Sequence, residues 1–221
     1  MKKNNDAGGA SVFGGMLRPA VVSAVFFMVV TGIVYPLTTT IVAQALFPGQ
    51  AHGSLIEYNH RLLGSRLIGQ YFTMPRYFHG RPSATTGTDP HDPAKTVDQP
   101  YNAASSGASN QGALSRALLD AVATRAKAYR EENGLAPDAK VPADAVTASA
   151  SGLDPDISPE NARLQAPRVA RARNLSLRTI LTQVDRHTAG RQLGVLGTPR
   201  VNVLELNLAL DEAAPAKPLV R

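Results

Sequence analysis

The sequence contains neither cysteine nor tryptophan. Without cysteine the chain has no disulfide framework, no thiol chemistry and no cysteinyl metal site. The absence of tryptophan also argues against a site that stacks sugar rings. Disulfide-stapled scaffolds and thiol-dependent enzymes are therefore excluded as descriptions of this chain.

Several motifs of nucleotide and hydrolase chemistry are missing too. No G-x-x-x-x-G-K-[ST] loop, no glycine-rich nucleotide fingerprint and no G-x-S-x-G elbow occurs. The five histidines never fall at metal-ligand spacing. The acidic stretches Asp89–Asp92 and Asp154–Asp156 lack the ligand periodicity of a cation-binding loop, so turn and cap roles are favoured. We therefore expect no metal site and no ATP hydrolysis by this chain alone.

Charged side chains are missing from the whole stretch between Arg18 and Glu57. Its first part, Pro19 to Thr40, is dominated by Val, Ala, Phe, Ile and Leu. As a helix it would extend about 33 Å, which matches a hydrocarbon core of roughly 30 Å. We expect a transmembrane helix and its extension over 18–47, because Pro48-Gly49 breaks a helix.

The flanks of this helix predict its orientation. Lys2, Lys3 and Arg18 lie on its N-terminal side, where Asp6 is the only acidic residue. Because cytoplasmic flanks carry an excess of Lys and Arg, the N-terminus is expected in the cytoplasm. Everything beyond the span is then expected in the periplasm.

Four segments follow from this topology. Residues 1–17 are predicted to be a cytoplasmic tail, residues 48–211 one compact periplasmic domain, and residues 212–221 a disordered tail. A cleaved signal peptide is the alternative, because Ala43-Gln44-Ala45 resembles a cleavage site. The apolar run exceeds the usual length of about 7–15 residues in a signal peptide, which favours a retained anchor.

Small residues mark one face of the predicted span. Ala20, Ala24 and Gly32 would allow another helix to approach closely. Pro36 leaves a carbonyl of the preceding turn unpaired, which a partner helix or a nearby Thr hydroxyl can satisfy. The alternative is that small residues and proline are simply frequent in membrane helices. We expect membrane helix packing through the three small residues, with both interpretations open.

The net charge of +6 is modest. Without the three basic residues and one acidic residue up to Arg18, 20 basic and 16 acidic residues remain, a net charge of +4. Nucleic-acid binding is not needed to explain this surplus. The densest basic set is interpreted as a solvated helix face, with contact to an acidic partner or a phosphate as the alternative. Its members are Arg163, Arg168, Arg171, Arg173 and Arg178.

The first half of the outer domain predicts little regular structure. Short apolar runs bounded by glycine within 50–80 indicate one or two short strands. Residues 77–112 are rich in Pro, Gly, Ser, Asn and Asp, which indicates a long functional or partner-facing loop, with disorder as the alternative. A helix is expected over 114–133, with Gly134 placed to end it.

The second half is predicted to be mainly helical. Ser158 and Pro159 can start a helix that runs to about residue 173, with a boundary or kink near Pro167. A further helix is expected over 176–188. Apolar residues alternate over 200–210, which predicts a final strand with one buried face. The expected fold is one N-terminal transmembrane helix and an α+β periplasmic domain with a small sheet backed by helices.

Several ordered motifs between the apolar helix and Asp211 carry a family resemblance. They are Gly64-Ser65, Leu67-Ile68-Gly69-Gln70, Tyr77-Phe78-His79-Gly80-Arg81-Pro82-Ser83, Tyr101-Asn102, Ser109-Asn110, Ser151-Gly152-Leu153-Asp154-Pro155, Gln165, Pro167-Arg168-Val169-Ala170 and Val201-Asn202-Val203-Leu204-Glu205-Leu206-Asn207. Together they resemble the KdpC subunit of the bacterial potassium-transporting ATPase. Ala108 and Gln111 depart from the family pattern beside Ser-Asn.

The resemblance implies an accessory, non-catalytic subunit of the KdpFABC potassium-uptake complex in the bacterial inner membrane. Its partners would be a channel-like potassium-translocating subunit, a P-type ATPase subunit, a small subunit and the lipid bilayer. This chain lacks the D-K-T-G-T phosphorylation motif of P-type ATPases. No tightly bound cofactor is expected, and ATP would act through the complex.

The family is described as a catalytic chaperone that raises the nucleotide affinity of the ATPase subunit, and the resemblance implicates Gln165. The predicted topology opposes direct ligation, because a periplasmic Gln165 lies across the membrane from cytoplasmic ATP. Coupling through the complex would need a two-state element that both sites bias. The alternatives are a periplasmic cap over the K⁺ entrance with no nucleotide role, and an exported soluble periplasmic protein.

Overall fold

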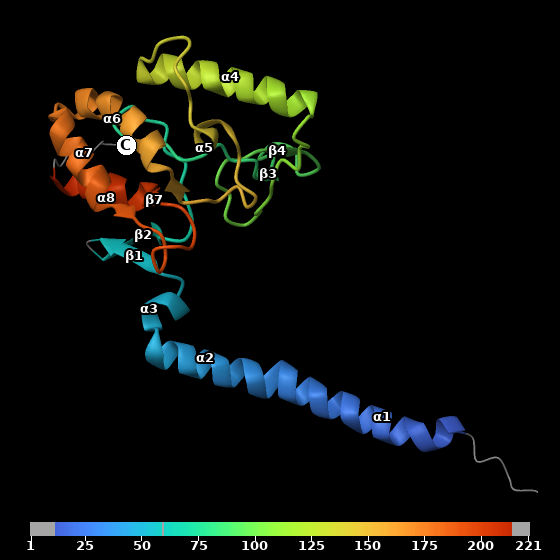
Figure 1. The fold of residues 1–221 in the computed structure, drawn as a ribbon. Helices are drawn as coiled ribbons and strands as arrows, with labels where there is room; N and C mark the ends of the chain where they lie inside the picture. The colour runs from blue at the N-terminus through green and yellow to red at the C-terminus, as the bar shows by residue number, and fades with distance from the viewer. Residues whose placement is uncertain (1–11, 59, 214–221) are drawn as a thin grey trace, which may run out of the picture. The chain divides into compact units, whose positions relative to one another are not determined.

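The computed structural model describes residues 12–58 and 60–213 and divides the chain into two compact units, Met1–Ser54 and Leu55–Arg221 (Figure 1). The first unit is helical. It contains α1 (Val12–Val29), the π-helical turn η1 (Val30–Val34), α2 (Tyr35–Leu46) and the short α3 (Pro48–Ala51). The second unit holds all the strands of the described chain.

The apolar helix of the first unit spans Gly15–Leu46 and is long and apolar enough to cross a membrane. It begins upstream of the expected start at residue 18. Helix α1 starts before Pro19 and continues through it. Ala20, Ala24 and Gly32 are exposed, and a Cβ built at Gly32 would meet nothing within 4 Å. Their role in packing against another helix stays a prediction.

Just before Pro36 the helix contains one π-helical turn, which holds more residues than an α-helical turn. The Tyr35 N–H bonds to the Val30 carbonyl, which is the i→i+5 pattern of a π turn. Pro36 lacks an N–H and its ring crowds the preceding turn, which explains the defect. Thr39 Oγ1 donates to the carbonyls of Tyr35 at 2.9 Å and Pro36 at 3.0 Å. This hydroxyl bonds carbonyls at the proline and not the carbonyl of the preceding turn, so how that carbonyl is satisfied stays a prediction.

The second unit is an α+β domain with three small antiparallel sheets. β1 (Leu55–Tyr58) pairs with β2 (Arg61–Ser65), and β3 (Thr86–Thr88) pairs with β4 (Thr96–Asp98). The third sheet has the order β5-β7-β6, with β5 at Asp156–Ile157, β6 at Thr188–Ala189 and β7 at Arg200–Asn202. In the β1–β2 hairpin the register shifts between Ile56 and Glu57.

Five helices complete the domain (Figure 1): α4 (Arg116–Asn133), α5 (Ala143–Val146), α6 (Pro159–Arg173), α7 (Leu177–Arg186) and α8 (Val203–Ala213). The capping residues act as the sequence predicts for α4 and α6. The Ser158 hydroxyl accepts from the Asn161 N–H at 3.1 Å, and Gly134 ends α4 with a left-handed φ of 66°. These caps fix where the long helices start and stop.

The hydrophobic core lies between α6, α7, α8 and the three-stranded sheet. Its fully buried members come from each of these elements and from one loop residue, Phe78. They include Phe78, Ile157, Ala166, Val169, Ile180, Val184, Val201, Leu206 and Leu210. The core therefore anchors the 77–83 loop as well as the regular structure.

The strand predicted over 200–210 is wrong beyond Asn202. Only Arg200–Asn202 forms a strand, and Val203–Ala213 is helical. The Asn202 carboxamide oxygen accepts from the Glu205 N–H at 3.0 Å, so Asn202 caps the helix. Burial at Val203, Leu206 and Leu210 follows helical spacing, whereas the alternating leucines gave a misleading period of two.

Other expectations need smaller corrections. The 77–112 segment is mostly irregular, as expected, but contains the β3–β4 hairpin. Helix α6 passes Pro167 without a boundary, and α7 ends at Arg186 rather than 188.

The solvated-face interpretation of the basic set is wrong for two of its five members. Arg168 is buried, and only 1% of the Arg173 side chain is exposed. Arg163, Arg171 and Arg178 are exposed, as the interpretation requires.

Candidate functional site

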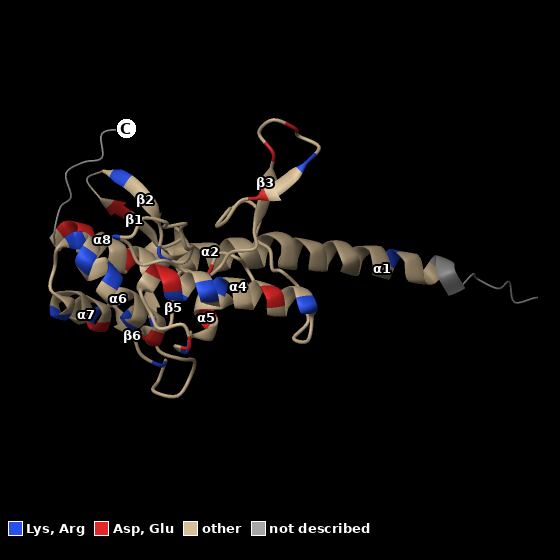
Figure 2. Ribbon diagram, turned by 90° about the horizontal axis from the view of Figure 1, so that it is seen from above, with Lys and Arg blue, Asp and Glu red and all other residues tan. Residues whose placement is uncertain are grey.

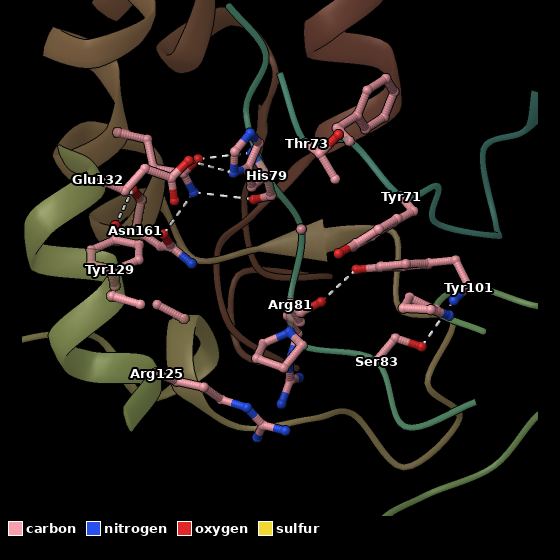
Figure 3. Close-up of a pocket in the computed structure, with 17 residues that line it drawn as sticks. Tyr71, Thr73, His79, Arg81, Ser83, Tyr101, Arg125, Tyr129, Glu132 and Asn161 are labelled. Carbon is pink, nitrogen blue, oxygen red and sulfur yellow. Dashed lines mark hydrogen bonds and ion pairs between the residues drawn. The ribbon is translucent and has the colours of Figure 1, made fainter. Parts of the chain in front are cut away.

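A pocket of about 480 Å³ opens between α4 and the segment that runs from Tyr71 to Ser83 (Figure 3). Tyr101 also lines it, together with Asn161 and Gln165 of α6. The lining mixes aromatic rings with arginine, histidine and glutamate. This pocket contains the one residue to which the family resemblance assigns a nucleotide role.

Gln165 lines the pocket but is buried, with 2% of its surface exposed. Its carbonyl oxygen accepts from the His79 N–H and from Arg168 Nη2, both at 2.8 Å. Its amide nitrogen donates to the His79 carbonyl at 3.1 Å and to Asn161 Oδ1 at 2.8 Å. A glutamine amide offers two acceptor and two donor positions, so its hydrogen-bonding capacity is filled by the protein.

Asn207 of α8 repeats this arrangement one residue earlier in the loop. Its carbonyl oxygen accepts from the Phe78 N–H at 2.8 Å, and its amide nitrogen donates to the Phe78 carbonyl at 2.9 Å. We call Gln165 and Asn207 the amide clamp. Each side chain pairs with both backbone groups of one residue, as a neighbouring strand would, and so satisfies the buried loop backbone.

Arg168 ties the preceding turn to the same helix. It is 5% exposed, and its guanidinium donates to the carbonyls of Pro75 at 2.7 Å and Tyr77 at 3.0 Å. Its Nε donates to Asn133 Oδ1 at 3.0 Å. Burial lowers the pKa of Arg168 from its usual value. Buried donors that all find acceptors stiffen a site, so this arginine fixes the loop rather than presenting a charge to a ligand.

A second set of motif residues fastens the loop to the 147–155 segment. Arg81 Nη1 donates to Asp154 Oδ2 at 3.0 Å, and the Ser83 hydroxyl donates to the Gly152 carbonyl at 2.7 Å. Gly152 has a left-handed φ of 68°, and a Cβ there would lie 2.6 Å from a Thr85 methyl carbon. Only glycine fits such a backbone without strain.

Position 80 requires glycine for a different reason, which is the close contact of its backbone with Tyr101. The Tyr101 hydroxyl donates to the Arg81 carbonyl at 2.8 Å. A Cβ on residue 80 would overlap that hydroxyl oxygen, so the Tyr101 ring would have to move. Burial raises the pKa of the Tyr101 hydroxyl, so it stays protonated and keeps donating. The ring of Tyr71 stacks beside it, with 6.4 Å between ring centroids.

The opposite wall of the pocket carries an acid and an imidazole (Figure 3). His79 Nδ1 lies 3.0 Å from Glu132 Oε1, and His79 Nε2 lies 3.1 Å from the Met74 carbonyl. The hydrogen bond to His79 lowers the pKa of Glu132 below its usual 4.5. The Tyr129 hydroxyl donates to Asn161 Oδ1 at 2.8 Å, and burial raises the pKa of Tyr129. Each polar group is engaged by another part of the domain.

Most of the motif residues named by the resemblance meet around this loop. Pro82 lines the pocket with Gly80, Arg81 and Ser83. The Leu153 carbonyl accepts from the Gly69 N–H at 2.8 Å, and the Pro155 carbonyl accepts from the Val203 N–H at 2.9 Å. Asn202 donates to the Arg66 carbonyl at 2.8 Å. The motifs therefore describe one scaffold that joins the loops to the sheet.

Two motif residues lie elsewhere. Ser109 and Asn110 are exposed, and no side-chain hydrogen bond or ion pair is found for them within residues 12–58 and 60–213. Asn110 adopts a left-handed φ of 49°, which asparagine tolerates better than most residues. Sequence reasoning missed Tyr129, Glu132 and Asn161. Their helical spacing to Arg125 and Gln165 was the available signal, but pairing α4 with α6 needs the tertiary structure.

Comparisons with known proteins agree with the motifs. The family model described as KdpC, K⁺-transporting ATPase, c chain, matches residues 17–212. A potassium-transporting ATPase KdpC subunit of Bradyrhizobium diazoefficiens is 54% identical over 198 residues, covering 90% of this chain and 97% of the relative. One of Rhodopseudomonas palustris strain BisB18 is 54% identical over 197 residues, covering 89% and 98%.

A third relative, a KdpC subunit of Methylorubrum extorquens, is 55% identical over 198 residues and covers 90% of this chain and 97% of the relative. The match includes the apolar helix, the amide clamp and α8. Such identity over nearly the whole length leaves one assignment. The chain belongs to the KdpC family, the c chain of the K⁺-transporting ATPase.

Proposed function

We propose that the chain is a single-pass accessory subunit that holds a potassium-uptake ATPase complex together in the bacterial inner membrane. The apolar helix Gly15–Leu46 supports the anchor, and family membership supports the complex. The basic flank of the helix supports a cytoplasmic N-terminus and a periplasmic domain. Its partners are then a channel-like potassium-translocating subunit, a P-type ATPase subunit and a small subunit, with the domain near the K⁺ entrance.

The anchor makes the first contact in this proposal. Lipid tails give no hydrophobic driving force for helix association, so close packing at small residues has to supply it. Replacing Ala20, Ala24 and Gly32 together by Leu is expected to lower copurification of the other subunits. The matched control replaces Val21, Val25 and Ile33 by Leu, which changes a different face and keeps the helix apolar. Unchanged recovery of the triple variant would remove this packing claim.

The orientation of the chain has a separate test. Protease added from the periplasmic side of sealed spheroplasts is expected to remove the domain and leave the N-terminal tail intact. Mass spectrometry of the untreated protein is expected to find that tail attached. A chain that starts near residue 46 would instead support an exported soluble protein.

The proposal gives the chain no catalytic group and no direct ATP ligand. The observation that carries this is the filled hydrogen-bonding capacity of Gln165, whose four partners are all protein groups. A nucleotide could reach the amide only by unpairing buried groups, each at a cost of about 1–3 kcal/mol. Any effect of this chain on the ATP affinity of the ATPase subunit then passes through subunit contacts.

Equilibrium binding of ATP separates the two mechanisms. The full-length chain in detergent is expected to give no saturable signal at millimolar ATP, with or without Gln165→Ala. The assembled complex is expected to bind ATP, and its affinity is expected to fall when this chain is removed. Saturable binding to the isolated chain that disappears in Gln165→Ala would overturn indirect coupling and support a nucleotide site in the pocket.

A further inference from the structure

The connection between β6 and β7 forms an apolar projection from the domain. It runs from Arg191 to Gly197 and extends beyond the neighbouring helices and strands (Figure 2). Three large apolar side chains are exposed in it: Leu193 to 91%, Val195 to 70% and Leu196 to 57%. We call residues 191–197 the projecting loop. Single exposed leucines are ordinary, but three within four residues form a patch that favours binding.

The projecting loop is held in one shape by its own backbone. The Gln192 N–H donates to the Leu196 carbonyl, and the Leu196 N–H donates to the Gln192 carbonyl, both at 2.9 Å. Leu193 adopts a left-handed φ of 52°, beside Gly194 at 76°. A leucine in this conformation carries a strain that such residues show mostly where function requires it. The loop therefore presents its apolar side chains in a defined arrangement.

Basic residues flank the apolar tip in the sequence. The stretch from Arg186 to Leu204 contains Arg186, Arg191 and Arg200 but no aspartate or glutamate. Arg200 is paired with Asp156, with 3.0 Å between Nε and Oδ2. Arg186 and Arg191 are exposed, and their side chains have no ion pair or hydrogen bond within the described part of the chain. Their charge is available to an acidic surface.

We propose that the projecting loop docks into an apolar pocket with an acidic rim on another protein subunit of the same membrane complex. This proposal rests on the assembly function proposed above and names the surface that performs it on the domain. A lipid surface would accept an apolar, basic segment of any shape. The closed backbone and the left-handed leucine indicate a partner that requires one shape, which is a folded protein surface.

The absence of cysteine in the natural sequence allows a direct test. Leu193→Cys in the full chain, labelled with a benzophenone maleimide and irradiated in membranes that contain all subunits, is expected to crosslink to one partner subunit. Leu114→Cys is the matched control, because Leu114 is 93% exposed in another loop. It is expected to give no such product. Crosslinking of position 193 to lipid alone, or to nothing, would overturn the proposal.

Affinity variants give an independent readout. Leu193→Asn removes the apolar side chain and keeps a residue that tolerates the left-handed conformation, so the fold is retained. It is expected to raise the dissociation constant for the partner subunit by roughly tenfold, as for loss of a central apolar contact. Leu193→Met and Leu114→Asn are expected to leave it unchanged. Equal affinities for Leu193→Asn and the natural chain would contradict docking.

Charge reversal tests the acidic rim. Arg191→Glu is expected to weaken binding of the partner subunit most at low ionic strength, because salt screens exposed charges. A salt-independent effect would contradict an acidic rim. If the natural chain recovers no partner at all, the assembly function itself fails. If it recovers partners and all projecting-loop variants do so equally, only the docking surface is wrong.

Discussion

Two irregular segments of the domain differ in how their backbone is satisfied. The Pro75–Ser83 segment packs against α6, α8 and the 147–155 segment, which supply the amide clamp, Arg168 and Asp154. The projecting loop is held by hydrogen bonds within itself and leaves its leucines exposed. Both are loops in the sequence, yet side chains of distant helices fix one and leave the other to meet a partner. Substitutions should therefore damage stability in the first and binding in the second.

The largest stability loss is expected from Arg168→Met. Three acceptors lose their partner: the Pro75 and Tyr77 carbonyls and Asn133 Oδ1. Gln165 Oε1 keeps only the His79 N–H. Each buried acceptor left without a partner costs about 1–3 kcal/mol, so the expected loss is about 3–9 kcal/mol. Thermal unfolding of the full-length chain in detergent should show a strongly lowered midpoint. A shift no larger than that of the exposed Arg171→Met would contradict this role.

A smaller loss is expected from Asn207→Leu. This change leaves the buried Phe78 N–H and carbonyl without partners. The expected cost is about 2–6 kcal/mol, since each of the two unpaired buried groups costs about 1–3 kcal/mol. Denaturant unfolding measures this loss of stability. The control is Leu208→Asn, a change of similar size at a half-buried position of the same helix. If Asn207→Leu unfolds at the natural midpoint, the amide clamp does not hold the loop.

The His79–Glu132 contact should give a small, pH-dependent effect. The folded pKa of Glu132 lies below its usual 4.5, so ionised Glu132 stabilises the domain above that pH. This contribution is lost as the pH falls through the folded pKa. Because 40% of the Glu132 side chain is exposed, Glu132→Gln should cost no more than about 1 kcal/mol at pH 7. Unfolding midpoints of the two proteins should converge as the pH falls through the folded pKa of Glu132; a constant difference would contradict the ionic origin.

The smallest effect on stability is expected in the projecting loop. Leu193 is 91% exposed, so Leu193→Asn removes almost no buried apolar surface. The free energy of unfolding should change by no more than about 0.5 kcal/mol. The same thermal scans provide the measurement. A loss as large as that of Asn207→Leu would place the leucine in the core and end the contrast between the two loops.

Local signals predicted much of the fold. Ser158, Gly134 and the apolar run after Arg18 each act over a few residues, so the start of α6, the end of α4 and the long apolar helix followed from sequence. The 200–210 strand failed because the alternating leucines were weighed above Asn202, which caps a helix. Propensity and pattern conflicted there, and the tertiary packing of Val203, Leu206 and Leu210 decided it.

The candidate site was only partly predictable. The motif containing Gly80, Arg81 and Ser83 was identified, but the roles of Arg81 and Ser83 depend on segments about 70 residues away, and that of Gly80 depends on contact with Tyr101. The family resemblance alone implicated Gln165 in nucleotide binding, and nothing in the sequence indicated the partners of its side chain. Only the structure pairs it with His79 and Asn161. Burial of a polar group therefore cannot be inferred from its residue type.

The short link between the two units has a consequence for affinity. Leu46 ends α2 and Leu55 begins β1, so the intervening residues span at most about 30 Å when fully extended. A partner subunit already bound to the helix then meets the domain at an effective concentration of about millimolar. A docking contact that is weak between free proteins can therefore be occupied in the assembled complex.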